Sequence, residues 1–295
     1  MPDLDPHQLP SARQRREECV RIALEAGALL RSRFGRPGEI LAKGTPDDLE
    51  RMYDVVTEVD FLSEKLILDR IAELDPGAIA LAEEGGFVRA DGAPITGHDA
   101  ELQPDDLDEV WLIDPIDGTI NFAHGVPHFC VSIACWRGAR PVAGAIVDPM
   151  IGETFSFEWD DPAAGTVRTA FHNDEVVHLG GGRPTIDSLL TIGGGGPKLR
   201  PIMRQFRSWR RIGSAALALA WVGVGRCGAY IQPGNLSPWD WGVGAPFVEA
   251  AGGVVTDAGG ATWAPRLHGV TGVIAGSRVV HGAIAEQAAE ANANW

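Results

Sequence analysis

The chain has 295 residues, 45% of them hydrophobic, so it is long and apolar enough to bury a sizeable core. Its 25 basic and 40 acidic residues give a formal net charge of −15, which disfavours general nucleic-acid binding because a phosphate backbone needs a basic surface. The four cysteines form no Cys-x-x-Cys pair, and there is no run of about 18 apolar residues and no signal-peptide pattern. We therefore expect a globular cytoplasmic protein with reduced thiols that neither spans a membrane nor binds nucleic acid directly.

The first half of the chain mixes predicted helices and strands. Helical spacing of apolar residues predicts helices over 11–34, where Ser11 is suited to the N-cap, and over about 60–74. The predicted strands are 79–82, 110–113, 130–136, 142–148, 155–159 and 166–171. The last four form two hairpins. The stretch 87–108 is acidic and lacks periodicity, so it is predicted to be a surface loop.

The residue composition of the sequence changes near residues 180–186. We place a boundary there, which gives an N-terminal subdomain 1–182 and a C-terminal subdomain 183–295. The predicted strands of the second part are 189–192, 228–232, 254–257 and 272–275. Its predicted helices are 214–222, 240–251 and 284–291. Pro246 should kink the second of these helices or lie in its first turns.

Two acids stand at the end of the predicted strand 110–113. Asp114 precedes Pro115, which keeps the backbone extended, and Asp117 follows three residues later, just before Gly118. Burying two carboxylates is costly unless a cation lies between them. The free N–H groups of the turn that follows could then hold an anion such as phosphate.

Three further acids stand where a strand ends or a helix begins, namely Asp60, Glu83 and Asp240. Each also has a purely structural interpretation: Asp60 and Asp240 as helix N-caps, and Glu83 as part of a solvated turn. Mg²⁺ prefers oxygen ligands, and two or three such ions can neutralise a phosphate, activate water and stabilise the leaving oxygen. Together the five acids favour magnesium-dependent hydrolysis of a phosphate monoester.

Four segments of the chain resemble the motifs of the inositol-monophosphatase-like, magnesium-dependent, lithium-sensitive phosphatases. Residues 111–122 match Trp-x-Ile-Asp-Pro-Ile-Asp-Gly-Thr-x-Asn-Phe, and residues 54–60 resemble Asp-Leu-Val-Thr-x-x-Asp. Residues 82–84 resemble Gly-Glu-Glu, and Trp239-Asp240 with residues 249–253 resembles Trp-Asp…Glu-Ala-Gly-Gly. The resemblance implies an α+β fold, a layered α/β/α/β/α sandwich of the inositol monophosphatase/fructose-1,6-bisphosphatase type, and commonly a homodimer.

The resemblance also implies a role for particular residues. The ligands of a first Mg²⁺ would be Glu83, Asp114 and the main-chain carbonyl of Ile116. Those of a second would be Asp114, Asp117 and Asp240, and a third, weaker ion would use Glu83 and waters. The attacking water would be oriented and deprotonated by Thr119 with Asp60. The phosphate would be bound by the N–H groups of Gly118 and Thr119, with Lys43 nearby as a positive charge.

The substrate side is less closely matched. Gly213-Ser214-Ala215 resembles the family's Gly-Thr-Ala substrate edge, so Ser214 is expected to bond a substrate hydroxyl. Gln232 stands near the position of an acid that binds inositol hydroxyls in inositol phosphatases, and it would bond a polyol without charge. The expected substrate is a small phosphorylated metabolite, a polyol or sugar phosphate of the inositol type.

Two alternatives stay open at this point. One is a different phosphate ester: histidinol phosphate, fructose 1,6-bisphosphate or 3′-phosphoadenosine 5′-phosphate. The other is a regulatory partner protein of RNA-processing or transcription machinery that uses the same fold.

Overall fold

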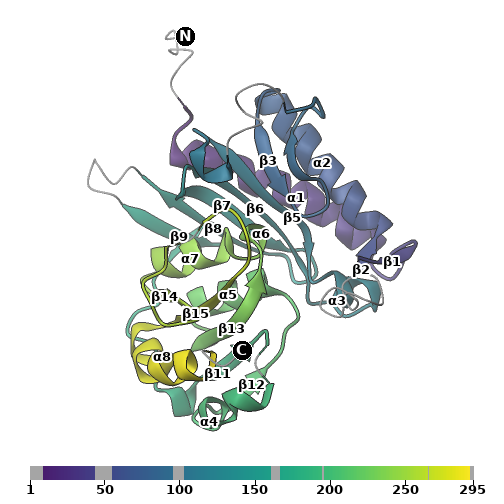
Figure 1. The fold of residues 1–295 in the computed structure, drawn as a ribbon. Helices are drawn as coiled ribbons and strands as arrows, with labels where there is room; N and C mark the ends of the chain where they lie inside the picture. Colours follow the sequence, from purple (N-terminus) through teal and green to yellow (C-terminus); the bar gives the residue numbers. More distant parts are fainter. Residues whose placement is uncertain are drawn as a thin grey trace.

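The computed structural model describes residues 9–43, 55–95, 103–160, 167–194, 196–264 and 266–292. In this part of the chain, helices and two large sheets stack in the order helix, sheet, helix, sheet, helix (Figure 1). This is the layered α+β sandwich that the family resemblance implied. Asp54, Thr166 and Gly195, which belong to predicted motifs, strands or connections, lie outside the described residues.

The first sheet has eight strands in the order β10-β9-β8-β7-β6-β5-β3-β4. Its strands are β3 (Ile79–Ala82), β4 (Gly86–Arg89), β5 (Val110–Asp117), β6 (Cys130–Arg137), β7 (Arg140–Asp148), β8 (Glu153–Trp159), β9 (Arg168–His172) and β10 (Glu175–Val177). Among the described strands of this sheet, β3 and β5 pair in parallel and the other neighbouring pairs are antiparallel. The two predicted hairpins, β6 with β7 and β8 with β9, are confirmed.

Helices cover both faces of this sheet, which explains the continuous apolar runs of its central strands. Helices α1 (Ala12–Arg33) and α2 (Glu58–Leu74) cover the outer face. Side chains of β6 alternate between the two faces: Val131 packs with the α1 and α2 layer, whereas Trp136 packs with the middle helices.

The middle layer lies between the two sheets. It holds α5 (Ala215–Gly223), α6 (Pro238–Trp241) and α7 (Gly244–Ala250). One hydrophobic cluster runs from the first sheet through these helices to the second sheet. The strands of the two sheets separate in sequence between Val177 and Leu189. The division at residues 182 and 183 stays a prediction.

The second sheet has five strands in the order β12-β11-β13-β15-β14. They are β11 (Leu189–Ile192), β12 (Ser208–Arg210), β13 (Ala229–Leu236), β14 (Val254–Asp257) and β15 (Thr271–Gly276). Helices α4 (Arg200–Met203) and α8 (Arg278–Asn292) cover its outer face. Strands β1 (Ile40–Ala42) and β2 (Val55–Thr57) pair with each other, and α3 (Thr119–Ala123) follows β5. The described residues also include the short 3-10 helices η2 (Pro104–Asp106), η4 (Thr185–Asp187) and η5 (Gly196–Leu199).

Several predicted boundaries were wrong. The stretch predicted as a loop from residue 87 contains most of β4, which pairs with β3. The helix expected over 240–251 is two helices, because the chain turns between α6 and α7 at Gly242 and Val243. Pro246 is the third residue of α7, within the first turn, where its missing N–H has no intrahelical acceptor. Helix α8 begins six residues earlier than expected.

Two global predictions can be compared with the described residues. The four cysteines are buried and free. No helix in the described segments is long and apolar enough to cross a bilayer.

Candidate active site

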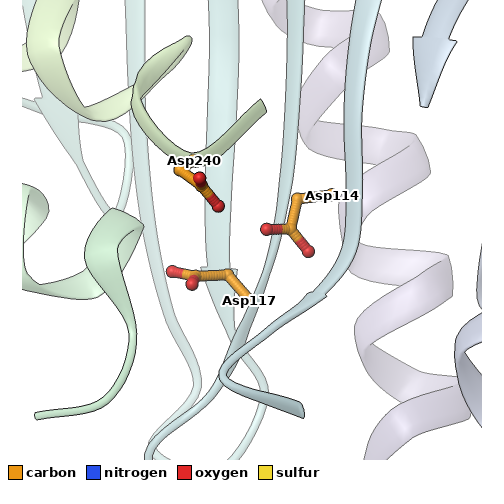
Figure 2. Close-up of side chains that lie close together, drawn as sticks. All are labelled: Asp114, Asp117 and Asp240. Carbon is orange, nitrogen blue, oxygen red and sulfur yellow. The ribbon is translucent and has the colours of Figure 1, made fainter. Parts of the chain in front are cut away.

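Three carboxylates meet where β5 ends. Asp114 and Asp117 come from β5, where the pairing with β6 becomes irregular, and Asp240 comes from α6 in the middle layer. One carboxylate oxygen of each acid lies within 4.8 Å of the others. Figure 2 shows the three side chains pointing toward a common space. Acids that are 123 to 126 residues apart in sequence, counting from Asp240 back to Asp117 and Asp114, therefore form one cluster.

Helix capping holds Asp240 and Asp60 in place. Asp240 is the third residue of α6, and its Oδ2 accepts a hydrogen bond of 2.6 Å from the N–H of Ser237, the N-cap. Asp60 has the same position in α2, and its Oδ2 accepts from the N–H and hydroxyl of Thr57 at 2.7 and 2.6 Å. Such a capping box fixes the carboxylate. The N-caps are thus Thr57 and Ser237, and the two acids are their partners.

Asp60 also reaches Thr119 at the start of α3. The Thr119 hydroxyl lies 3.1 Å from Asp60 Oδ1 and 2.9 Å from the main-chain oxygen of Ile116, and its single hydrogen can serve one of these acceptors at a time. Burial raises the pKa of Asp60, against the opposing effect of the Thr57 hydrogen bonds. A buried carboxylate with a raised pKa is a stronger base than an exposed one.

Glu83 lies beside the three clustered acids. Its N–H donates to the main-chain oxygen of Ile113 at 3.0 Å, which keeps it next to β5. The ammonium of Lys43, which follows β1, lies 2.6 Å from Glu83 Oε1 and 2.6 Å from Glu84 Oε1. Burial raises the pKa of Glu83, with Lys43 opposing the rise. The structure thus places Lys43 against the Glu83–Glu84 pair.

Asp117 is held by the start of α5. Its carboxylate accepts hydrogen bonds from the Ser214 hydroxyl at 2.5 Å, the Ala216 N–H at 2.6 Å and the Ala215 N–H at 3.1 Å. Burial raises the pKa of Asp117 to about 6, although these hydrogen bonds lower it. The first sheet and the middle helix layer are therefore joined at this acid.

The turn between β5 and α3 requires glycine. Gly118 has φ +99°, and a side chain there would place Cβ 2.9 Å from the main-chain oxygen of His128. Asn121, one turn later, donates to the main-chain oxygens of His128 at 2.7 Å and Ile212 at 2.8 Å. The amide of Asn121 thus ties α3 to the segment that carries Gly213.

Gln232 lies on β13. Its amide nitrogen donates to the main-chain oxygen of Gly234 at 2.6 Å, and its amide oxygen is buried without a partner among the described residues. The pKa of neighbouring Tyr230 is raised by burial first and then by the charges of Asp117 and Asp240. The described contacts of Gln232 do not include a cluster acid.

Sequence reasoning assigned no role to Asn121, Glu64 or Tyr230. Asn121 lies inside the matched motif, which names the residue type but not its partners. Glu64 is one helical turn after Asp60, so helical spacing was an available signal. Its Oε2 accepts the N–H of Glu84 at 2.9 Å and so supports the turn that carries Glu83.

The residues present fit a hard divalent cation. The clustered side-chain donors are all carboxylates, the ligands that Mg²⁺ prefers. The pKa of Asp114 is raised well above its usual value, by burial first and then by the charges of Glu83, Asp117 and Asp240. A divalent cation between these acids would relieve that repulsion.

Comparison with known proteins gives a consistent result. The family model described as "Inositol monophosphatase family" matches residues 12–293. The inositol-1-monophosphatase of Mesorhizobium japonicum is 33% identical over 251 residues, which cover 82% of this chain and 84% of the relative. The Nus factor SuhB of Pseudomonas aeruginosa is 36% identical over 215 residues, which cover 69% of this chain and 72% of the relative.

Solved structures agree with the sequence comparisons. An IMPase of Thermotoga maritima superposes with a TM-score of 0.78 at 28% identity, covering 95% of this chain and 99% of that chain. The suhB protein of Bartonella henselae gives a TM-score of 0.76 at 30% identity, with 92% and 97% covered.

The fold and the acid cluster define a metal-dependent phosphatase, an enzyme of the phosphoric monoester hydrolase class. The family match spans nearly the whole chain, and the relatives are at least 30% identical over most of it. The chain belongs to the inositol monophosphatase family.

Proposed function

We propose that the protein is a Mg²⁺-dependent phosphomonoesterase that hydrolyses a small polyol or sugar phosphate of the inositol phosphate type. The observation that carries this proposal is the meeting of Asp114, Asp117 and Asp240 within 4.8 Å. The hydrogen-bonded pair of Asp60 and Thr119 supports it. Two relatives are named as phosphatases of this type. They are the inositol-1-monophosphatase of Mesorhizobium japonicum and the fructose-1,6-bisphosphatase/inositol-1-monophosphatase of Thermotoga maritima.

The proposed metal ligands follow from this cluster. Asp114, Asp117 and Asp240 would hold one ion. Glu83, Asp114 and the main-chain oxygen of Ile116 would hold another, and Glu83 with waters a third. When bound, these two or three ions would neutralise the phosphate oxygens, lower the pKa of the attacking water and stabilise the leaving oxygen.

The remaining site residues position the substrate and move a proton. Asp60 is held by Thr57, and its other oxygen faces the Thr119 hydroxyl, so Thr119 can pass a proton to Asp60 while its oxygen accepts one from water. The N–H groups of Gly118 and Thr119 at the start of α3 are the proposed phosphate donors.

Fewer contacts support the proposed substrate-binding residues than support the metal ligands. The amide oxygen of Gln232 has no partner in the described part of the chain, so it is the proposed acceptor for a substrate hydroxyl. Gly213, whose main-chain oxygen would lie 3.2 Å from a Cβ at Gly118, is also proposed to line the substrate edge. The homodimer and the cytoplasmic location expected from the sequence stay predictions, and light scattering on a size-exclusion column tests the first.

A substrate panel tests the proposal. Phosphate release is measured with Mg²⁺ from inositol 1-phosphate, histidinol phosphate, fructose 1,6-bisphosphate and 3′-phosphoadenosine 5′-phosphate, and again with Li⁺ added. Asp117→Asn should lower the rate at least ~10²-fold, because it removes one charge from the cluster. Asp69→Asn is the matched control, since Asp69 is exposed on α2 and pairs with Lys65. Equal rates for wild type and Asp117→Asn would refute the enzymatic role of the cluster.

The second candidate function is a regulatory partnership with transcription machinery. The observation that favours it is the name of the Pseudomonas aeruginosa relative, Nus factor SuhB. A complementation experiment in cells that lack this protein distinguishes the two functions. Rescue of their growth by the Asp117→Asn variant would favour the partnership, and rescue by the wild type alone favours catalysis.

A further inference from the structure

The hydroxyl of Ser214 makes two hydrogen bonds that leave it no hydrogen for a substrate. A carboxylate can only accept, so in the 2.5 Å contact with Asp117 the hydroxyl must be the donor. Its oxygen accepts the N–H of Leu217 at 3.2 Å, as the N-cap of α5. Ser214 is 4% exposed. These contacts differ from the substrate contact that the sequence resemblance implies for Ser214.

The same hydroxyl is one of three donors that fix the Asp117 carboxylate. Ser214 and the Ala216 N–H bond one oxygen, and the Ala215 N–H bonds the other at 3.1 Å. The Cys130 thiol approaches both Asp117 and Ser214 at 3.7 Å, so the pair is packed as well as hydrogen-bonded. With both oxygens bonded, the carboxylate cannot rotate freely.

The contact joins two parts of the fold that come from distant parts of the sequence. Asp117 ends β5 of the first sheet, and Ser214 precedes α5 in the middle layer, 97 residues later. Ser214 also caps the first turn of α5, because its hydroxyl oxygen accepts the N–H of Leu217. The Ser214 side chain therefore contributes both to the N-cap of α5 and to the orientation of the Asp117 carboxylate.

We propose that Ser214 is a positioning residue for the metal site: its hydroxyl orients Asp117 for metal binding and does not contact the substrate. The inference rests on the proposed function, because it assumes that Asp117 binds a divalent ion. Partners that orient a metal ligand typically change metal affinity 10–100-fold when they are removed. A substrate contact would instead change the KM for the substrate.

Magnesium binding in the absence of substrate tests the proposal. Mg²⁺ alone is titrated calorimetrically into metal-free protein. Ser214→Ala and Ser214→Gly should raise the dissociation constant about 10–100-fold, and Ser214→Thr, which keeps the hydroxyl, should stay within about threefold of wild type. The glycine variant protects the test against misfolding, because glycine is tolerated at an N-cap at little cost.

Ser11→Ala is the matched control. Ser11 also caps a helix, accepting the Gln14 N–H at 3.3 Å, but its described contacts are within the start of α1. Ser11→Ala should leave magnesium affinity unchanged.

A parallel assay at saturating Mg²⁺ measures substrate binding. The KM of Ser214→Ala for the best ester of the panel should stay within about twofold of the wild-type value.

The possible outcomes distinguish the role of Ser214 from the proposed function. Unchanged magnesium affinity in Ser214→Ala and Ser214→Gly, with a raised KM, would overturn the positioning role and restore the substrate contact. An equal loss of affinity in Ser11→Ala would overturn it as well, because general destabilisation would then be the cause. A wild type that bound no magnesium would refute the proposed function itself, and the inference with it.

Discussion

Replacing Glu64 by glutamine should stabilise the protein at alkaline pH more than at acidic pH. Glu64 is 6% exposed on α2, and its Oε2 holds the N–H of Glu84 at 2.9 Å. Burial raises the pKa of Glu64 from 4.5 to about 7, although its hydrogen bonds from backbone N–H groups lower it. Glutamine has nearly the same shape and keeps an oxygen that can accept the same hydrogen bond.

The sign and magnitude follow from proton linkage. Because the pKa of Glu64 is higher in the folded protein, the folded state holds this proton more tightly than the unfolded state. The stability that the protonated side chain contributes is present below pH 4.5 and is lost as the pH rises through about 7. At about 1.4 kcal/mol per pKa unit, the full loss is roughly 3 kcal/mol, an upper figure because the side chain is not completely buried. Glutamine avoids this loss.

Urea unfolding of metal-free protein at pH 5 and pH 8 measures the effect. The free energy of unfolding of Glu64→Gln minus that of wild type should be roughly 2–3 kcal/mol larger at pH 8 than at pH 5. Glu73→Gln is the matched control, because Glu73 lies on the same helix with a side chain that is 62% exposed, and it should show little pH dependence. An equal change at both pH values, or a loss at pH 8, would refute the reasoning.

Three further substitutions test other parts of the site. Gly118→Ala should cost about 2–4 kcal/mol in urea unfolding, because alanine at φ +99° would bring Cβ within 2.9 Å of the His128 main-chain oxygen; unchanged stability would contradict this. Lys43→Met should tighten calorimetrically measured Mg²⁺ binding about fivefold or more, because it removes an ammonium 2.6 Å from Glu83; weaker binding would be the opposite result. Thr119→Val should lower kcat about 10²-fold or more with unchanged Mg²⁺ affinity, since it keeps the shape but loses the hydroxyl bonded to Asp60.

Local patterns predicted the elements whose residues interact mainly with their sequence neighbours. Helix α1 follows from the spacing of its apolar residues and from Ser11 at its N-cap. The hairpins β6–β7 and β8–β9 follow from apolar runs separated by turn residues, such as Gly138 with φ +56°. The strand predicted over 110–113 is present, but it was expected to end at Asp114, whereas β5 continues to Asp117 with an irregular register between the two acids.

Elements that depend on contacts across the fold were not predictable in this way. β4 is only partly buried, so it shows no apolar alternation, and its pairing with β3 defines it. The break between α6 and α7 depends on close packing, since a Cβ at Gly242 would lie 2.6 Å from Leu112 and one at Gly244 would lie 2.5 Å from Leu219.

The candidate site shows the same limit. Single motifs identified the acids, and the family resemblance suggested that they meet. The hydrogen bonds from Ser214 to Asp117 and from Asn121 to Ile212 link residues more than 90 positions apart. No local pattern contains such partners, so the structure was needed to find them.

The position of a bound divalent ion in a crystal structure shows whether Asp114, Asp117 and Asp240 form one metal site. Crystals grown with Mn²⁺, an electron-rich ion that accepts the same oxygen ligands, give an anomalous signal at each metal. An anomalous peak bonded by carboxylate oxygens of Asp114, Asp117 and Asp240 is the expected result. Peaks found only elsewhere on the protein, with these three acids bound to no ion, would contradict it.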